Sequence, residues 1–403
     1  MLARRTTRVS TSPTMKVGVE ADRLRRQGKD VVELGAGEPD FATPDHVKAA
    51  AIAAIDANFT KYTANAGITD LRAAIVAFYR RLYGIELTEA EVIVSAGGKQ
   101  ALYNPALAII DAGDEVITHA PGWPTLREQI KLADATPVIV RAHADAGFAL
   151  TAQPFIDAMS PRTRAVIVNS PCNPTGALMS EAEMALLADA CAARGIWVLL
   201  DLCYEQLIYE PTPHNLPRVL FERMRDRTVI AGSASKTYAM TGWRCGWTVA
   251  APSVIAACNA IQSHATSNVC SITQRATVAA LGGPQACVGE MLGEYRARRD
   301  MIWALLTADP RIRCVKPSGA FYLFIDIGDL LSPDGIRTST EFAERLLEEQ
   351  YVALTGGEAF DAPGFLRISY ATSVEQLQEG ARRFHAFVAS LDAAGSASAA
   401  ASR

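Results

Sequence analysis

The chain has 403 residues, 49% of them hydrophobic and 20% charged, a composition typical of folded proteins and long enough for two domains. A formal net charge of −4 gives no general attraction to polyanions, so we expect a small-molecule partner and neither nucleic acid nor a membrane. No apolar run approaches the length of a membrane span and no two of the eight cysteines form a C-x-x-C pair, so the sequence predicts a cytoplasmic protein without a metal site.

Helical and strand patterns alternate through the first two thirds of the chain. Apolar residues recurring every three or four positions from Leu71 predict a helix that ends at Gly84. A second helix is predicted from Ser180, with Ser180 and Glu183 as a capping box, to Gly195. Runs typical of buried strands occur at 92–94, 116–118, 138–140, 165–168, 196–200 and 229–231. This alternation favours an α/β fold with a mostly parallel sheet covered by helices on both faces.

The pattern changes after about residue 294, which indicates a smaller second domain. Helices are predicted at 295–306 and 339–349, and strands at 320–325 and near Val352 and Phe365. The Ala- and Ser-rich tail offers no large apolar residue for packing, so we expect it to be flexible.

Lys236 stands in a segment whose residue types suit phosphate and aldehyde chemistry. It follows Gly232-Ser233-Ala234-Ser235, directly after a predicted strand, and Arg244 comes later in the same segment. Ser233 can donate to a phosphate and Arg244 can clamp it in a two-pronged way, which leaves the lysine amine free to condense with an aldehyde. Most lysines are solvated surface charges, so this segment alone also fits an ordinary surface lysine.

At two further positions the sequence also allows both a functional and an ordinary structural interpretation. Asp201 ends a strongly apolar strand, where a buried carboxylate needs a partner, although an exposed strand-end acid or a helix cap fits equally. Gly97 and Gly98 lie between a strand and a helix, where backbone amides can receive a phosphate. A short glycine turn without a ligand is also common.

The segment Ser-Ala-Ser-Lys-Thr-Tyr-Ala-Met-Thr-Gly-Trp-Arg, 233–244, closely resembles the cofactor-lysine segment of class I aminotransferases. More segments resemble the family in its order: AGEPDF (36–41), KYT (61–63), GGKQAL (97–102), NSPCNPTG (169–176), DLCY (201–204), GAFY (319–322) and RISYATS (367–373). The resemblance, which is to aspartate-aminotransferase-like members, covers roughly residues 5–385. It implies the fold type I of pyridoxal-phosphate-dependent transferases: a large domain with a mostly parallel seven-stranded sheet between helices, plus a smaller α+β domain.

The resemblance also implies a domain division and a homodimer with shared active sites. An N-terminal arm at 1–45 would begin the small domain, 46–293 would form the large cofactor domain, 294–390 the small C-terminal domain, and 391–403 a flexible tail.

The family's functional residues carry over onto matching positions. Pyridoxal 5′-phosphate is implied as cofactor, with Lys236 as Schiff-base lysine and general base. Asp201 would lie beside the ring nitrogen, and Tyr204 would contact the phenolic oxygen as the third catalytic residue. The implied cofactor-binding residues are Gly97, Gly98, Lys99, Trp123, Asn173, Asp201, Tyr204, Ser233, Ser235, Lys236, Arg244 and, from the neighbouring subunit, Tyr62. The implied substrate-binding residues are Gly37, Trp123, Asn173, Arg367 and Lys99, with Arg367 on the α-carboxylate.

The implied reaction moves an amino group from an L-amino acid to a 2-oxo acid by a ping-pong mechanism. Lys99 matches a lysine that contacts the distal carboxylate in one branch of aspartate aminotransferases, whereas Lys16 stands where a threonine is expected. An aspartate-like donor is favoured, and aromatic, basic or small aliphatic donors stay open. Cys172 replaces a commonly polar residue, and Pro105 is expected to bend its helix or end the first turn.

A pyridoxal-phosphate-dependent lyase on the same fold is the main alternative, because the same residues would serve it. A ligand-sensing regulator would need an added DNA-binding module, which is not expected before the motif at 36–41.

Overall fold

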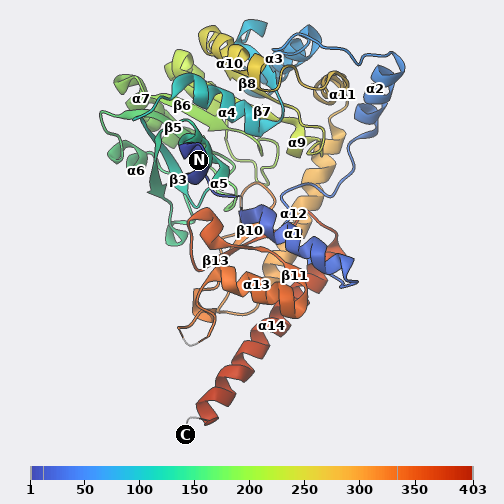
Figure 1. Cartoon of the computed structure of the whole chain (residues 1–403), viewed down its shortest axis with the longest axis vertical. Coiled ribbons are helices and arrows are strands. Elements are labelled where there is room, and N and C mark those ends of the chain that lie inside the picture. The colour runs from blue at the N-terminus through green and yellow to red at the C-terminus, as the bar shows by residue number, and fades with distance from the viewer. Residues whose placement is uncertain (1, 12, 334, 402–403) are drawn as a thin grey trace.

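The computed structural model describes residues 2–11, 13–333 and 335–401 and shows two packed regions (Figure 1). The upper one in Figure 1, here called the large region, is built around a seven-stranded sheet. The lower one, here called the small region, holds a four-stranded and a two-stranded sheet with α1 (Pro13–Arg26), α13 (Ser339–Gln350) and α14 (Val374–Ala401). The helix α12 (Ala286–Leu306) joins them, because its Val288 packs in the core of the large region and its Tyr295 in that of the small region.

The seven-stranded sheet has the strand order β2-β8-β7-β6-β5-β3-β4. Its strands are β2 (Val92–Ser95), β3 (Glu115–Ala120), β4 (Thr136–Arg141), β5 (Thr163–Asn169), β6 (Trp197–Asp201), β7 (Thr228–Ser233) and β8 (Gly246–Ala250). β8 runs antiparallel to both of its neighbours, β2 and β7, whereas the other neighbouring strands of this sheet pair in parallel. The predicted mostly parallel sheet is therefore confirmed, and the sequence missed β8 because Gly246 and Thr248 interrupt its apolar pattern.

Successive residues of the inner strands point to opposite faces of the sheet, and both faces are buried. Ile230 belongs to the core on one face, and its neighbour Val229 to the core on the other. The first face is covered by α2 (Asp45–Asp56), α3 (Thr69–Tyr83), α6 (Ala152–Asp157), α7 (Glu181–Arg194), α8 (Leu216–Met224) and α11 (Ser271–Gly282). The second is covered by α4 (Gly98–Ile109), α5 (Pro124–Leu132) and α10 (Pro252–Ala265). This double covering explains why the strands are almost continuously apolar.

The predicted helix ends are confirmed at α3 and α7, with one correction. Gly84 and Gly195 follow the last residues of these helices with φ of 65° and 67°, a left-handed conformation that glycine adopts without strain. The Ser180 hydroxyl accepts the Glu183 N–H, as predicted. The Glu183 carboxylate does not complete the capping box, because it accepts the N–H of Ala152 instead. A tertiary contact has taken the place of the local one.

Pro105 lies inside α4, which continues to Ile109, so the expectation that this proline could end the first turn is wrong. Proline has no N–H and leaves the carbonyl four residues earlier, at Ala101, without its helical donor. The Thr248 hydroxyl of β8 donates to that carbonyl at 2.7 Å. A side chain from the sheet therefore replaces the missing helical hydrogen bond.

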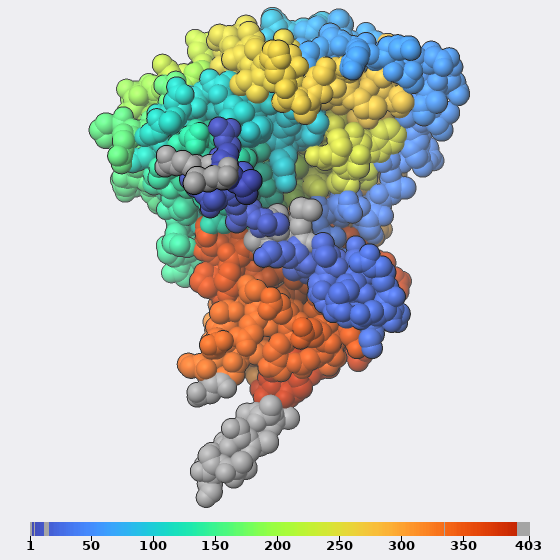
Figure 2. Space-filling view, viewed as in Figure 1, coloured from blue at the N-terminus to red at the C-terminus, as the bar shows by residue number. Residues whose placement is uncertain are grey.

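Segments from both ends of the chain build the small region. β1 (Val32–Glu33) pairs in parallel with β11 (Val352–Ala353). Leu24 of α1 packs in one cluster with Ala353 of β11 and Leu347 of α13. Figure 2 shows α1, in blue, lying against the orange small region. The four-stranded sheet has the order β12-β13-β10-β9, with β9 (Arg313–Cys314), β10 (Tyr322–Asp326), β12 (Thr355–Gly356) and β13 (Phe365–Ser369).

Short helices complete the described chain. These are η1 (Arg4–Thr7), η2 (Glu89–Glu91), η3 (Ala144–Ala146), η4 (Arg225–Arg227), η5 (Gly328–Leu330), η6 (Gly357–Phe360) and α9 (Ala234–Thr237). Within the described residues, no helix has both the length and the apolar character needed to cross a membrane.

The start predicted for α12 needs correction, and the sequence analysis did not predict α14. The boundary predicted at 293/294 falls inside α12, which begins at Ala286 and not at Tyr295. The division into domains stays a prediction. The Ala- and Ser-rich composition does not end α14, which runs to Ala401; its C-terminal end points away from the rest of the molecule (Figure 1). Residues 402–403 lie outside the described residues, and the flexibility of the tail stays a prediction.

Candidate active site

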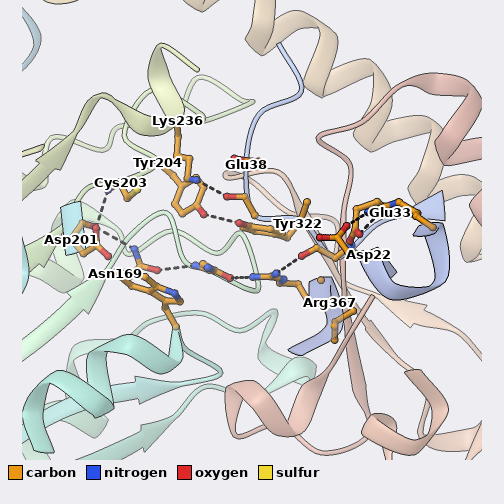
Figure 3. Close-up of a pocket in the computed structure, with 18 residues that line it drawn as sticks. Asp22, Glu33, Glu38, Asn169, Asp201, Cys203, Tyr204, Lys236, Tyr322 and Arg367 are labelled. Atoms are coloured by element: carbon orange, nitrogen blue, oxygen red, sulfur yellow. Dashed lines mark hydrogen bonds and ion pairs between the residues drawn. The ribbon is translucent and has the colours of Figure 1, made fainter. Parts of the chain in front are cut away.

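A cavity of about 470 Å³ lies where the strand ends of the large region face the small region (Figure 3). Asp201, Asn173 and Lys236 reach its wall from the large region, whereas Tyr322 and Arg367 come from β10 and β13 of the small region. The carboxyl ends of β5, β6 and β7 meet at this edge of the sheet, where open α/β sheets bind ligands.

Lys236 lies on α9, the short helix that follows β7. Ser233 caps this helix, since its hydroxyl accepts the Ser235 N–H at 3.1 Å. The Lys236 ammonium donates to the Gly37 carbonyl at 2.5 Å, and burial lowers the pKa of Lys236 below its ordinary value. A lowered pKa increases the fraction of neutral amine near neutral pH, and only the neutral amine attacks a carbonyl carbon.

Asp201, the last residue of β6, has no cationic partner among the described residues, although it is only 3% exposed. Its Oδ1 accepts the Cys203 N–H at 3.0 Å. Burial raises the pKa of Asp201 to about 7, against the opposing effect of this hydrogen bond. A buried carboxyl without a partner is costly, so its place on the cavity wall indicates a positive group that enters from the cavity.

Asn169 and His119 support the strand ends behind Asp201. The Asn169 side-chain amide donates to the Asp201 carbonyl at 3.4 Å and its oxygen accepts the Asn173 N–H at 2.8 Å. His119 Nε2 accepts the Asn169 N–H at 3.3 Å, and its Nδ1 lies 3.1 Å from the Pro121 carbonyl. Burial lowers the pKa of His119 to about 4, so the ring is neutral, and these partners place its proton on Nδ1.

Two buried phenols meet on another wall of the cavity. The hydroxyls of Tyr204 and Tyr322 lie 2.8 Å apart (Figure 3). Burial raises the pKa of Tyr204 well above its ordinary value and also raises the pKa of Tyr322. Both side chains are therefore neutral at physiological pH, and one of them retains a proton that it can donate into the cavity.

Arg367 is a buried cation without a carboxylate partner in the part of the chain that the structure describes. Its Nη1 donates to Asn173 Oδ1 at 3.1 Å and its Nη2 to the Gly35 carbonyl at 2.8 Å. Its Nε has no hydrogen-bond partner among the residues that the structure describes, and its guanidinium carbon lies 4.4 Å from the centroid of the Tyr322 ring. Neutral oxygens do not cancel its charge, so the site favours an anion that a guanidinium binds with two hydrogen bonds, such as a carboxylate.

A tight glycine turn leads into α4 next to the cavity. Gly97 has a φ of 85°, and a Cβ at this position would lie 2.6 Å from Nη2 of Arg244. A Cβ on Gly246 would lie 2.6 Å from the Gly98 nitrogen. Arg244 donates to the Thr241 carbonyl at 2.9 Å. The first N–H groups of α4 and the Arg244 guanidinium together can hold a phosphate.

The chain is similar over nearly its whole length to known aminotransferases. A family model described as aminotransferase class I and II matches residues 29–384. An aspartate aminotransferase of Geobacillus stearothermophilus is 41% identical over 96% of this chain and 98% of its own length. An aspartate/prephenate aminotransferase of Cereibacter sphaeroides is 42% identical over 95% of this chain and 98% of its own length. The chain belongs to the class I and II aminotransferase family.

Solved structures agree with this assignment. The aspartate aminotransferase from Thermus thermophilus with maleate superposes with a TM-score of 0.90 at 40% identity, over 95% of this chain and 98% of that one. The aspartate aminotransferase from Rhizobium meliloti gives 0.91 at 39% identity, over 97% and 99%. The protein is an aminotransferase of fold type I.

The cavity of this aminotransferase brings together seven of the predicted site residues. These are Gly37, Trp123, Asn173, Asp201, Tyr204, Lys236 and Arg367. Gly97, Gly98, Ser233, Ser235 and Arg244 lie at or near the N-terminal ends of α4 and α9. The roles predicted for these residues stay predictions.

Lys99 and Tyr62 belong to neither of these groups and do not line the cavity. Lys99 has its ammonium 5.3 Å from the centroid of the Trp123 ring, where burial and the charge of Arg244 lower its pKa, and it lines a neighbouring surface cavity. Tyr62 is 91% exposed. Lys16, considered as a substrate contact, lies in a separate groove beside α13.

The sequence interpretation missed several residues at the cavity. Asn169 and Tyr322 stand inside recognised motifs, which was the available signal. Asp22, Arg25 and Glu33 also line the cavity, with Arg25 ion-paired to Asp22 at 2.9 Å and to Glu33 at 3.1 Å. Nothing in the sequence distinguishes these three from ordinary surface charges.

Asp201→Asn is expected to stabilise the cofactor-free aminotransferase at pH 8 and to have a smaller effect at pH 5. The folded-state pKa of about 7 lies above the ordinary 3.8, so the folded protein binds a proton that the unfolded chain releases. Its stability therefore falls as the pH rises from about 4 to about 7, and asparagine removes this loss while it can still accept the Cys203 N–H. Urea unfolding of both proteins at the two pH values measures the effect. The exposed Asp226→Asn is the control, and an Asp201→Asn effect independent of pH would contradict the assignment.

Proposed function

We propose that this aminotransferase binds pyridoxal 5′-phosphate in the cavity and that Lys236 holds it covalently. The supporting observation is the position of the Lys236 amine and the unpartnered Asp201 carboxyl, which line one cavity from the ends of the neighbouring strands β7 and β6. A ligand with an aldehyde and a basic ring nitrogen satisfies both groups at once.

The other groups around the cavity fit the rest of this cofactor. The turn at Gly97 and Gly98, the N-terminus of α4 and Arg244 suit its phosphate. The face of Trp123 suits its ring, and the phenol of Tyr204 with the Asn173 amide suits its phenolic oxygen.

When bound, the cofactor supplies an aldehyde for imine formation and a ring that accepts electron density from the substrate. Asp201 stabilises positive charge on the ring nitrogen, and that cation in turn favours the ionised form of Asp201. Once its amine is free, Lys236 can act as a general base and take the proton from the substrate Cα. The ammonium that results can then donate this proton again as a general acid. Arg367 can bind the α-carboxylate with two hydrogen bonds, while Gly37 bounds the same part of the cavity.

We propose an aspartate-like dicarboxylate as amino donor, with a 2-oxo acid as acceptor and ping-pong kinetics. Support comes from the names of the full-length relatives, which are aspartate or aspartate/prephenate aminotransferases. Lys99 supports it further, because its ammonium lies over Trp123, whose ring lines the cavity. A distal carboxylate that passes this ring would meet a positive charge.

The purified protein with added pyridoxal 5′-phosphate should transfer the amino group of aspartate to 2-oxoglutarate. A panel of acidic, aromatic, basic and small aliphatic donors against 2-oxoglutarate, pyruvate and oxaloacetate, compared by kcat/KM, should rank the acidic donors first. A better aromatic or basic donor would reject the dicarboxylate preference alone. Release of ammonia or pyruvate from a donor without any oxo acid would instead favour a lyase.

We also propose that the active form is a homodimer in which Tyr62 reaches the phosphate of the neighbouring site. The support is its 91% exposed side chain, which has a polar tip but lies outside the cavity of its own chain. Sedimentation equilibrium should give the mass of two chains. A monomer with full turnover would reject this arrangement.

A further inference from the structure

The end of η6 in the small region is attached to the large region at three points. η6 ends at Phe360, and Asp361 follows it. The Gly122 N–H donates to the Phe360 carbonyl at 3.4 Å. Arg127 of α5 forms an ion pair with the Asp361 carboxylate, and Arg141, the last residue of β4, donates to the Asp361 carbonyl at 2.8 Å. Two consecutive residues thus receive one backbone and two side-chain contacts from the large region.

The backbone around Asp361 is held in a tightly folded loop. Asp361 has a φ of 58°, in the left-handed region that side-chain-bearing residues rarely adopt. Its N–H donates to the Glu358 carbonyl at 3.2 Å, and the Ala362 N–H donates to the Gly357 carbonyl at 3.0 Å. A Cβ on Gly357 would overlap the Ala362 carbonyl oxygen. The loop therefore has little freedom to relax if its outer contacts are lost.

This loop also supports the buried arginine of the site. Phe360 is fully buried, and its ring centroid lies 5.0 Å from the guanidinium carbon of Arg367. On the other side of the contact, Gly122 directly precedes Trp123, the residue that caps α5, and α5 carries Arg127. Two of the three contacts, those of Gly122 and Arg127, therefore connect the segment that bears Trp123 to the loop whose Phe360 ring packs against Arg367.

We propose that Arg127 and Asp361 act as positioning residues for substrate binding, by fixing Arg367 at a set distance from the cavity wall that carries Trp123. Here they are called the latch. This inference rests on the proposed role of Arg367 in binding the substrate carboxylate. Neither latch residue lines the cavity. Their effect passes through Phe360 to the guanidinium and through α5 to the tryptophan.

An exposed ion pair would contribute little, but this one is partly buried. The side chains of Arg127 and Asp361 are 24% and 27% exposed. Partial burial reduces screening by water and salt, and the loop conformation at Asp361 limits the alternatives that the carboxylate could adopt. The chain offers a matched pair away from the cavity: Arg72 and Glu89, with exposures of 23% and 39%.

Asp361→Asn and Arg127→Gln test the latch, with Arg127→Lys as the charge-retaining variant and Glu89→Gln as the matched control. The protein is used with pyridoxal 5′-phosphate bound, and maleate serves as the unreactive dicarboxylate probe. We expect both neutral variants to weaken maleate binding and to raise KM for donor and acceptor about 5- to 10-fold, with kcat changed by less than about twofold. Cofactor affinity and Tm should match those of Glu89→Gln. Arg127→Lys should restore most of the maleate affinity.

The double variant Arg127→Gln with Asp361→Asn should be no weaker for maleate than either single variant, because both remove the same contact. Losses that add in the double variant, unchanged maleate affinity in the singles, or losses equal to those of Glu89→Gln would each overturn the latch. Failure of the proposed function is a separate result, since it would appear in the unmodified protein as missing cofactor binding or missing turnover.

Discussion

Replacing Lys236 by alanine is expected to abolish the visible absorbance of the bound cofactor and to lower kcat by at least about 10⁴-fold. The variant loses the amine that holds the cofactor and also the base that moves the Cα proton, and a positioned general base alone is worth roughly 10²- to 10⁴-fold. Among the described residues the cavity lining holds no second lysine, and its other cations are the guanidiniums of Arg25 and Arg367. Absorbance spectra and single-turnover rates with aspartate measure the two losses.

Lys236→Arg separates charge from reactivity. It keeps a cation near the Gly37 carbonyl but cannot form the covalent link, so it should be as inactive as the alanine variant. Lys316→Ala, which removes an exposed lysine of the small region, should retain full turnover. An alanine variant of Lys236 with turnover within about tenfold of the unmodified protein would remove this residue from the mechanism.

Replacing Arg367 by methionine is expected to lower kcat/KM by roughly 30- to 5,000-fold for donors and acceptors alike, as loss of a buried charged partner costs about 2–5 kcal/mol. Both substrates of an aminotransferase carry an α-carboxylate, and Arg367 is a buried cation on the cavity wall that can receive it. Arg367→Lys should recover only part of the loss, because an ammonium cannot match the two-pronged geometry. The cofactor absorbance should remain.

An amine without a carboxylate is the internal control for this prediction. Its slow reaction with the bound cofactor should proceed equally in the unmodified protein and in Arg367→Met, because it makes no use of the guanidinium. If the variant loses this reaction to the same extent, Arg367 acts on the integrity of the cavity through Asn173 and Gly35, and not on the carboxylate.

Local patterns in the sequence predicted most of the fold. The apolar runs of β5, β6 and β7 and the glycine stops after α3 and α7 are short-range signals, and the structure confirms them. The errors arose where a distant residue changed the local preference. Thr248 supplies the hydrogen bond that Pro105 removes from α4. The Ala152 N–H donates to the Glu183 carboxylate, which would have been the acceptor in a capping box.

The residues of the candidate site also form two groups: those that a local sequence pattern identifies, and those that only the fold brings to the cavity. Residues inside recognisable segments, such as Lys236 and Asp201, could be named because the segment itself carries the signal. Asp22, Arg25 and Glu33 could not, since a charge on a helix or strand looks the same in the sequence whether it faces solvent or a cavity. Asp361 was missed for a related reason. Its importance depends on Arg127 and Arg141, which are far away in the chain.

The sequence by itself determined the class of fold and the chemical groups available, because strand burial, helix stops and the lysine segment are properties of neighbouring residues. Only the tertiary structure decided how those groups act together. The burial of a single polar side chain depends on distant segments, and it raises the pKa of Asp201 to about 7. The fold likewise places Arg367 beside neutral oxygens, with no carboxylate partner among the described residues. The contacts at Asp361 likewise exist only because the chain folds its two regions against each other, since electrostatic and packing interactions depend on distance in space and not on separation along the chain.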